Sequence, residues 1–255
     1  MTQITIAQLY PDQLGVTGDR GNVRALEVRL EAAGAEVSTH RVGPGDELPA
    51  GLDVLVVGNG PLSAMRGVHA DLMGRGDGIR SFAEAGGALL AVGGGAELLS
   101  RGITTLDGES IEGVGVFDAS VVRTRQRKVG YIVVDTPVGR VTGFEDYASE
   151  WSLAVPEHGY GRVQFGEGSF AVLDAGEPAR GELVRERNAF ASNIQGPLLP
   201  LNPELIREIL TGVAARRDIE LDLTVGVGAL DAYAAGARSA IETLVRGKGF
   251  HTIQL

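Results

Sequence analysis

The 255-residue sequence contains no cysteine. Without a thiol the chain can form neither a disulfide nor a thiolate metal site, and it has no cysteine nucleophile. Its four histidines include no pair spaced four residues apart and no HExxH motif. We therefore expect the protein to hold no metal and to need no cofactor.

Long apolar runs and excess positive charge are also missing. No apolar stretch approaches the ~20 residues that a membrane span requires, and the first residues, MTQITIAQLY, lack the basic start and long apolar core of a signal peptide. The 33 acidic residues outnumber the 23 basic ones, for a formal charge of −10, which disfavours binding to a phosphate backbone. These features predict a cytoplasmic protein without membrane insertion or nucleic-acid binding.

Glycine is abundant, with 38 residues, and hydrophobic residues make up 44% of the chain. In the first third, short apolar runs at 4–9, 54–57 and 88–92 have the character of buried strands. Between them, helical patterns begin near Asn22 and end at Gly34, and end again before Gly86. This alternation predicts an α/β fold with a parallel sheet and helices on both faces.

The second half has a different pattern. Short strand candidates at 129–134, 140–142, 162–165 and 170–173 are separated by turn residues, which predicts hairpins and an antiparallel strand section. Helical spacing returns from Pro203, and a last helix runs from Leu230 to Gly247 with a face of small residues. Such a face permits close packing on the same domain or on a partner.

The segment Leu89 to Leu99 reads LLAVGGGAELL, a strand that turns into a helix through small residues. This is the geometry of a nucleophile elbow, and the following helix start offers free N–H groups to a developing oxyanion. The apex would be Gly93, which has no reactive atom. Taken alone, the segment fits a plain glycine-rich turn better.

A second glycine loop follows the strand at 54–57. Gly58-x-Gly60-x-x-Ser63 nearly matches a dinucleotide fingerprint, but serine replaces the third glycine and Pro61 interrupts the pattern. A glycine turn after a strand is the better interpretation. The chain also lacks a Walker phosphate-binding loop.

Six separated blocks, taken together, resemble one family. They are LYPD with GDRGN at 9–12 and 18–22, VVGNG at 56–60, LAVGGGAELL at 90–99, RKVG at 127–130, GFE at 143–145, and QGPLLPLNP at 195–203. Their order and spacing resemble the class I, cobyric-acid-synthase-like (CobB/CobQ-like) glutamine amidotransferases. Within that class they are most similar to the glutamine amidotransferase subunit of lipid II isoglutaminyl synthase, GatD.

The resemblance implies a flavodoxin-like parallel sheet flanked by helices, followed by the antiparallel section. We expect an amidotransferase-like domain at residues 1–215 and a C-terminal helical extension at 216–255, packed on the same domain or on a partner. In this family an elbow cysteine attacks the glutamine amide and a histidine serves as its base. Those two positions fall on Gly93 and Gln195.

Neither replacement can perform the family's chemistry. Glycine offers no nucleophile, and a glutamine amide is not basic near neutral pH. The resemblance leaves a vestigial pocket in place, and we expect an ion pair between two of its members, Glu97 and Arg127. The pocket residues are Gly58, Asn59, Gly60, Gly94, Gly95, Glu97, Arg127 and Glu145.

The resulting prediction is a catalytically inactive amidotransferase-like subunit. By resemblance, its partner would be a Mur-ligase-like ATP-dependent amide ligase, in a heterodimer or larger complex. One alternative is an active amidotransferase or amidohydrolase in which Glu97, Glu145 or Asp146 acts as general base to a water. Another is a regulatory protein that binds a small amine or amino acid in the pocket.

Overall fold

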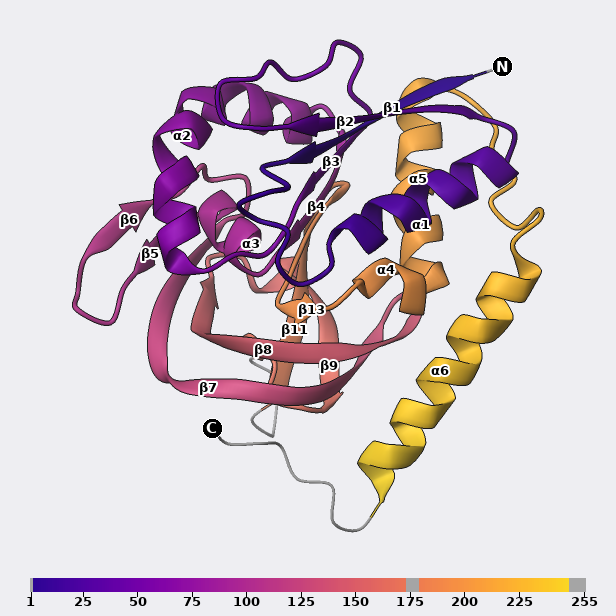
Figure 1. The fold of residues 1–255 in the computed structure, drawn as a ribbon. Coiled ribbons are helices and arrows are strands. Elements are labelled where there is room, and N and C mark those ends of the chain that lie inside the picture. Colours follow the sequence, from indigo (N-terminus) through magenta and orange to yellow (C-terminus); the bar gives the residue numbers. More distant parts are fainter. Residues whose placement is uncertain (1, 173–178, 248–255) are drawn as a thin grey trace.

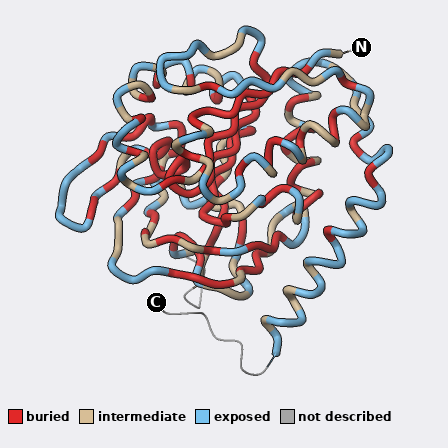
Figure 2. Tube along the Cα trace, viewed as in Figure 1, coloured by how far each residue is buried: buried red, intermediate tan, exposed pale blue. Residues whose placement is uncertain are grey.

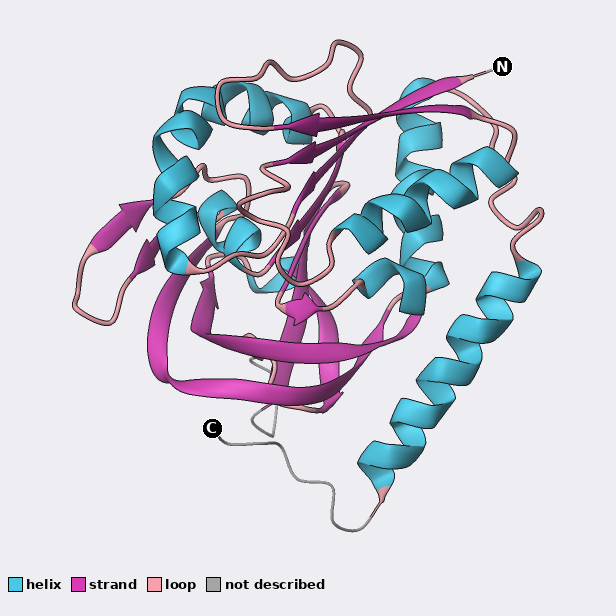
Figure 3. Ribbon diagram, in the orientation of Figure 1, coloured by secondary structure: helices cyan, strands magenta, loops and turns pink. Residues whose placement is uncertain are grey.

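The computed structural model describes residues 2–172 and 179–247, whose strands form one sheet (Figures 1 and 3). Its first part is parallel, in the order β2 (Glu36–Val42), β1 (Gln3–Leu9), β3 (Val54–Val57), β4 (Ala88–Val92) and β12 (Ala189–Ser192). This is the 2-1-3-4-5 order of flavodoxin-like sheets. The predicted strands at 4–9, 54–57 and 88–92 are confirmed.

Helices cover both faces of the parallel strands (Figure 1). α2 (Leu62–Glu84) and the short α3 (Gly94–Leu99) lie on one face, and α1 (Arg20–Ala32) and α5 (Pro203–Arg217) lie on the other. The short α4 (Leu198–Leu201) precedes α5 and contacts α1. The helices predicted near Asn22 and from Pro203 are confirmed.

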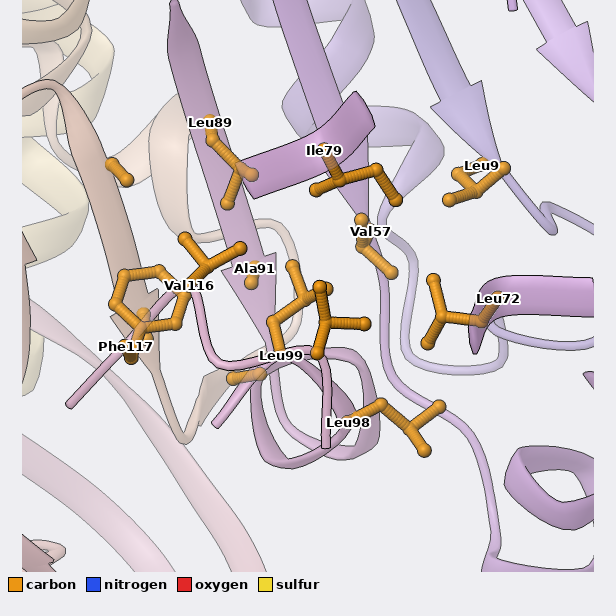
Figure 4. Close-up of a cluster of buried hydrophobic side chains, with 14 of the residues drawn as sticks. Leu9, Val57, Leu72, Ile79, Leu89, Ala91, Leu98, Leu99, Val116 and Phe117 are labelled. Atoms are coloured by element: carbon orange, nitrogen blue, oxygen red, sulfur yellow. The ribbon is translucent and has the colours of Figure 1, made fainter. Parts of the chain in front are cut away.

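The inner parallel strands β3, β4 and β12 are buried on both faces, as the continuous apolar sequences of β3 and β4 predict. Because side chains alternate along a strand, Val57 and Leu89 point into the core beneath α2 and α3 (Figure 4). Their neighbours Val56 and Leu90 point into the core beneath α1 and α5. Figure 2 shows this buried interior as a continuous region around the strands. The two cores fix β4, and therefore the turn after it, between two packed layers.

The antiparallel section predicted for the second half is confirmed, but its main hairpin is longer than expected. β7 (Ala119–Thr136) and β8 (Gly139–Leu153) extend the strands predicted at 129–134 and 140–142, and their pairing shifts register between Arg123 and Lys128. The strands were predicted too short because the polar half of the hairpin shows no apolar alternation. The remaining strands are β5 (Gly102–Thr104), β6 (Ser110–Glu112), β9 (Gly159–Phe165), β10 (Phe170–Val172), β11 (Ala179–Glu186) and β13 (Ile194–Gln195), with a 3₁₀ turn at Pro156–His158. Leu173, predicted to end the strand at 170–173, lies outside the described residues.

The last described element is α6 (Gly228–Arg246), which runs along one side of the molecule (Figure 1). The helix predicted from Leu230 is confirmed and begins two residues earlier. It contacts α4 and β7. None of the helices in the described ranges is both long and apolar enough to cross a membrane.

Candidate functional site

A sharp turn joins β4 to α3 at Gly93, as the small residues after Val92 predict. Gly93 has φ +51° and ψ −120°, a conformation that L residues with a Cβ adopt only under strain. Its N–H donates to the Ser192 carbonyl at 2.8 Å, and its carbonyl accepts the Glu97 N–H at 2.9 Å. These bonds anchor the turn to β12 and to the first turn of α3.

The Gly58-Asn59-Gly60 loop after β3 packs directly on this turn. The Gly95 N–H donates to the Gly58 carbonyl at 3.1 Å. A Cβ at Gly94 would lie 2.6 Å from the Gly60 carbonyl oxygen, and one at Gly95 would lie 2.5 Å from that of Gly58. Since contacts this short do not occur, glycine at both positions permits the approach. The structure thus brings together five of the predicted pocket residues.

The Asn59 side chain fills the space above Gly93. A Cβ built on Gly93 would lie 2.2 Å from Asn59 Oδ1. The same oxygen accepts the Gly94 N–H at 2.8 Å, which is one of the backbone donors that an elbow would offer to an oxyanion. Asn59 therefore fills the space that a side chain on residue 93 would need. It also accepts the hydrogen bond that the Gly94 N–H would otherwise offer to an oxyanion.

A buried carboxylate holds Asn59 in this place. Asp19, 1% exposed, accepts the Asn59 N–H at 3.0 Å. The Thr17 hydroxyl and the Asn22 side-chain amide donate to the same carboxylate, each at 3.3 Å. Burial raises the pKa of Asp19, and these hydrogen bonds oppose that shift. Sequence reasoning missed both Asn59 as a space-filling residue and Asp19 as its support, although GDRGN was among the blocks that carried the resemblance.

Gln195 lies at the same edge of the sheet, three residues after Ser192. It is 6% exposed and belongs to β13, where it pairs with Phe144 of β8. Its Nε2 donates to the Asp146 carbonyl at 2.6 Å. The amide is therefore bound to a neighbouring strand, and it has no basic lone pair with which to accept a proton from a nucleophile.

The expected ion pair between Glu97 and Arg127 is wrong. Glu97 is 2% exposed and pairs with Arg123 at 2.5 Å, while the Arg127 guanidinium binds Asp146 through Nε at 2.5 Å and Nη2 at 2.9 Å. Arg127 lies four residues beyond Arg123 on β7, about 13 Å further along an extended strand and within the stretch of the register shift, so it does not reach the carboxylate that Arg123 binds. Burial raises the pKa of Glu97, and the Arg123 charge opposes this shift.

Glu145 is fully buried and serves the backbone. Its carboxylate accepts the N–H groups of Glu167 at 2.7 Å and Gly168 at 3.2 Å. Burial raises its pKa to about 7, and the nearby charge of Glu182 adds to the shift, while these two hydrogen bonds and Lys128 oppose it. Glu145 therefore ties β8 to the turn before β10.

Two further buried charges extend this polar layer, and sequence reasoning did not find them. Glu182 of β11 accepts the Ser192 hydroxyl at 2.9 Å and the Asn193 N–H at 2.8 Å. Lys128 of β7 donates to Glu150 at 2.5 Å and to the Gly168 carbonyl at 2.8 Å. Both lie in strand segments that contain several other charged residues, so no signal in the sequence set these two apart. The layer fixes the strands on which Gln195 and Ser192 lie.

A cleft separate from the elbow opens between β8, β9 and β10. Its volume is about 780 Å³. Trp151, Tyr160 and Phe170 give it aromatic walls, and none of the predicted pocket residues lines it. In 2–172 and 179–247, no three His, Asp or Glu side chains are placed to hold a metal ion together.

Comparison of the sequence with known proteins finds similarity to glutamine amidotransferases. A family model described as the CobB/CobQ-like glutamine amidotransferase domain matches residues 5–202. The GatD subunit of the glutamine-hydrolysing lipid II isoglutaminyl synthase from Streptococcus pneumoniae is 28% identical, over 86% of this chain and 85% of the relative. The corresponding subunit from Staphylococcus aureus is 24% identical, over 87% of this chain and 89% of the relative.

Solved structures show the same fold. One, described as a glutamine amidotransferase, has a TM-score of 0.51 at 23% identity and covers 82% of this chain and 98% of its own. The glutaminase domain of a Trypanosoma brucei CTPS has a TM-score of 0.51 at 13% identity, with 85% and 95% covered. The family model spans well over half of the sequence, and the solved structures share the fold. The chain belongs to the CobB/CobQ-like glutamine amidotransferase family.

Proposed function

We propose that this chain is a catalytically inactive glutamine amidotransferase-like subunit that binds and supports a Mur-ligase-like ATP-dependent amide ligase. The observation that carries the proposal is the filled elbow. The apex residue Gly93 has no reactive atom, the chain has no cysteine, and Asn59 occupies the space in which a nucleophile's side chain would stand. Glutamine hydrolysis through a covalent thioester intermediate needs a cysteine nucleophile, and this chain has none.

The position of the base supports the same proposal. Gln195 is buried, and its amide donates to a backbone carbonyl. In a hydrolase triad, loss of the nucleophile alone costs on the order of 10⁶ in kcat, and loss of the base adds little. Glycine at 93 and glutamine at 195 are therefore compatible with a protein that natural selection has kept for a role other than glutamine turnover.

The role as a subunit is inferred from the relatives. Both GatD proteins are named as subunits of a synthase, and each matches this chain over most of its own length. A fold that keeps the elbow backbone and two packed cores, without the reacting groups, is suited to present a surface to such a partner. The ligase would then obtain its amine from free ammonia or another donor rather than from glutamine bound here.

The geometry does not favour the non-cysteine alternative. Glu97 is buried against Arg123, Glu145 is bound by two backbone amides, and Asp146 is held by Arg127. A general base must reach the proton that it removes, and each of these carboxylates is already engaged. The regulatory alternative needs a ligand site, and the aromatic cleft away from the elbow offers one. Thermal-shift screening with glutamine, glutamate and related amines would test whether the protein binds such a ligand.

Two measurements test the proposal. The purified chain, incubated with glutamine, should release no ammonia above a no-protein blank, whereas the Streptococcus pneumoniae GatD–ligase complex serves as the active control. Co-expressed with a Mur-ligase-like protein from its own genome, the chain should co-purify with it and raise its ammonia-dependent activity. Glutamine turnover that Glu97→Gln abolishes, or a ligase whose activity is independent of this chain, would overturn the proposal.

A further inference from the structure

A small polar cavity lies at the edge of the sheet opposite the elbow. The parallel strand β4 begins at this edge, where the Leu89 N–H donates to the Asn188 carbonyl at 3.0 Å, and it ends before Gly93 at the other edge. The last turns of α2 and the turn between β11 and β12 form part of the cavity wall. Its volume is about 230 Å³, below the ~300–1,000 Å³ of sites for drug-sized ligands. The cavity is therefore separate from the elbow and suits only a small molecule.

Charged side chains dominate the wall of this cavity, with three of each sign. They are Arg80, Arg101 and Arg187, and Glu84, Asp118 and Glu186. We call the space that they enclose the charged cavity. The other wall residues, Ala83, Gly115 and Val116, offer no polar side chain. A ligand here would be bound through ionic and hydrogen-bonded contacts rather than through apolar burial.

Three of these charges are engaged with one another or with a neighbouring histidine. The Arg101 guanidinium pairs with Asp118 at 2.5 Å. Glu186 accepts the Asp118 N–H at 2.6 Å and lies 3.1 Å from Nδ1 of His158. These three side chains therefore brace the wall, and a ligand could bind them only by replacing contacts that already exist.

Glu84 and Arg187 are the two charges of the cavity that remain available. Arg80 is engaged as well, because it donates to the Val114 carbonyl at 2.6 Å and pairs with Asp77. Within residues 2–172 and 179–247, neither the Glu84 carboxylate nor the Arg187 guanidinium has an ion-pair or hydrogen-bond partner. They line the same cavity without pairing with each other. The charged cavity thus offers a ligand one negative group and one positive group.

The backbone at Arg187 adds a second, independent sign of a binding site. Its φ is +54°, in the left-handed region that arginine rarely adopts and that glycine or asparagine would occupy with less strain. The turn is anchored on its far side by Asn188, whose buried side-chain amide donates to the Ile209 carbonyl at 3.1 Å. Strained residues of this kind cluster at ligand-binding sites. The strain places an arginine where the fold alone would favour a smaller residue.

We propose that the charged cavity binds a small zwitterion, a free α-amino acid, with its ammonium group on Glu84 and its carboxylate on Arg187. A guanidinium binds a carboxylate through two parallel hydrogen bonds, and a carboxylate accepts hydrogen bonds from an ammonium group. A ligand with a single charge would engage only one of the two side chains. The inference goes beyond the proposed function and does not rest on it, because none of the elbow residues is among those that line the cavity.

The first test compares L-alanine with two analogues that each lack one of its charges. Because Glu84 and Arg187 are exposed, their contacts are screened, and we expect a Kd of about 1–10 mM for L-alanine. Titration of the full chain, followed by amide chemical shifts at constant ionic strength, should move the signals of Gly115 and Arg187. Propionate lacks the ammonium group and ethylamine lacks the carboxylate, so each should bind at least about tenfold more weakly.

Three outcomes of this titration would overturn the proposal. Propionate that binds as tightly as L-alanine would show an anion site formed by the arginines alone. The absence of any shift at about 50 mM L-alanine, well above the expected Kd, would show that the cavity takes no amino acid. Shifts confined to Gly93 and its neighbours would place the ligand at the elbow instead.

The second test removes each charge in turn. Glu84→Gln and Arg187→Asn should each weaken the binding of L-alanine at least about tenfold, and asparagine tolerates the left-handed backbone at 187. The matched controls are Glu36→Gln and Arg125→Asn, which change exposed charges outside the cavity and should bind L-alanine like the wild type. The remaining amide signals report whether each variant is folded. Wild-type affinity in both cavity variants would contradict the assignment.

Failure of this inference is distinguishable from failure of the proposed function. A chain that binds no amino acid could still release no ammonia from glutamine and could still co-purify with its ligase. Conversely, glutamine turnover at the elbow would leave the binding of L-alanine at the opposite edge of the sheet unchanged.

Discussion

At position 93, any side chain would compete with Asn59 for the same volume. The Cβ of residue 93 would meet Asn59 Oδ1 at 2.2 Å, and the backbone is in a left-handed conformation. Both effects penalise a side chain, but only the first depends on Asn59. The two contributions can therefore be separated by mutation.

We expect Gly93→Ala to destabilise the protein by about 3 kcal/mol, through strain and overpacking together. Asn59→Gly should cost about 1 kcal/mol through its lost hydrogen bond. The double variant should be more stable than the sum of the two by at least about 1 kcal/mol, because the clash is gone. Urea unfolding of the four proteins measures the cycle. Gly67→Ala is the control, since a Cβ there meets open space in α2. Strictly additive effects of Gly93→Ala and Asn59→Gly would show that Asn59 does not cause the clash at residue 93.

Glu145 should make stability depend on pH. Its pKa is raised from 4.5 to about 7 in the folded protein, so between these values the folded state retains a proton that the unfolded state releases. The stabilising contribution is complete below about pH 4.5 and is lost as the pH rises through 7, by up to about 3 kcal/mol. The difference in unfolding free energy between the wild type and Glu145→Gln should fall accordingly from pH 4.5 to 8.

The control for this pH series is the exposed Glu84→Gln, which should follow the wild type at every pH. Parallel curves for Glu145→Gln and the wild type would show that Glu145 does not retain its proton. Other buried carboxylates also have raised pKa values, such as Asp19 and Glu97. They are present in both proteins, so the difference between the two curves isolates Glu145.

Among the elements, α6 gives the clearest test of an ion pair. Arg29 is 4% exposed, and it binds Asp231 and the Leu223 carbonyl. Asp231→Ala leaves a buried guanidinium without its counter-charge, which should weaken the docking of α6 by about 2 kcal/mol. Amide hydrogen exchange in α6 should then be about 30-fold faster.

Glu242→Ala is the matched control on the same helix. Its partner Arg140 has a side chain that is 41% exposed, so the loss should stay below about 1 kcal/mol. Equal exchange rates in the two variants would mean that burial of Arg29 does not determine how α6 is held.

The sequence predicted those elements whose periodicity reflects burial. β1, β3 and β4 are apolar on both faces, and α5 carries a regular apolar stripe, so their patterns were sufficient. β2 was missed because it is an edge strand whose residues are mostly exposed and polar. The lengths of β7 and β8 were underestimated for a related reason, since the polar part of this hairpin has no apolar alternation.

The candidate site was predictable in its backbone but not in its contacts. The glycines at 93–95 indicated the turn directly, because each permits a close approach or a strained φ. The expected Glu97–Arg127 pair was wrong because the resemblance placed Arg127 near the pocket without fixing which arginine of β7 reaches Glu97, and Arg123 occupies that position. The role of Asn59 depends on two loops meeting in space, which a single sequence does not encode as a pattern.

At the scale of the whole molecule, the net negative charge disfavours one class of ligand, nucleic acid. The formal charge of −10 should prevent binding to nucleic acid, because the net field of the protein repels a phosphate backbone. We expect a Kd weaker than about 100 µM for duplex DNA or RNA at 150 mM salt, measured by fluorescence anisotropy. Affinity that rises steeply as salt is lowered would contradict this expectation.

The contact between Asn59 and Gly93 has an evolutionary consequence. With asparagine at 59, a cysteine introduced at 93 would be forced into occupied volume, so the two positions are epistatic. A path that placed a thiol at 93 would have to change residue 59 first, and that change loses the hydrogen bond to the Gly94 amide. Either substitution made alone lowers the stability of the fold, so descendants of this sequence could gain a nucleophile at 93 only through a less stable intermediate.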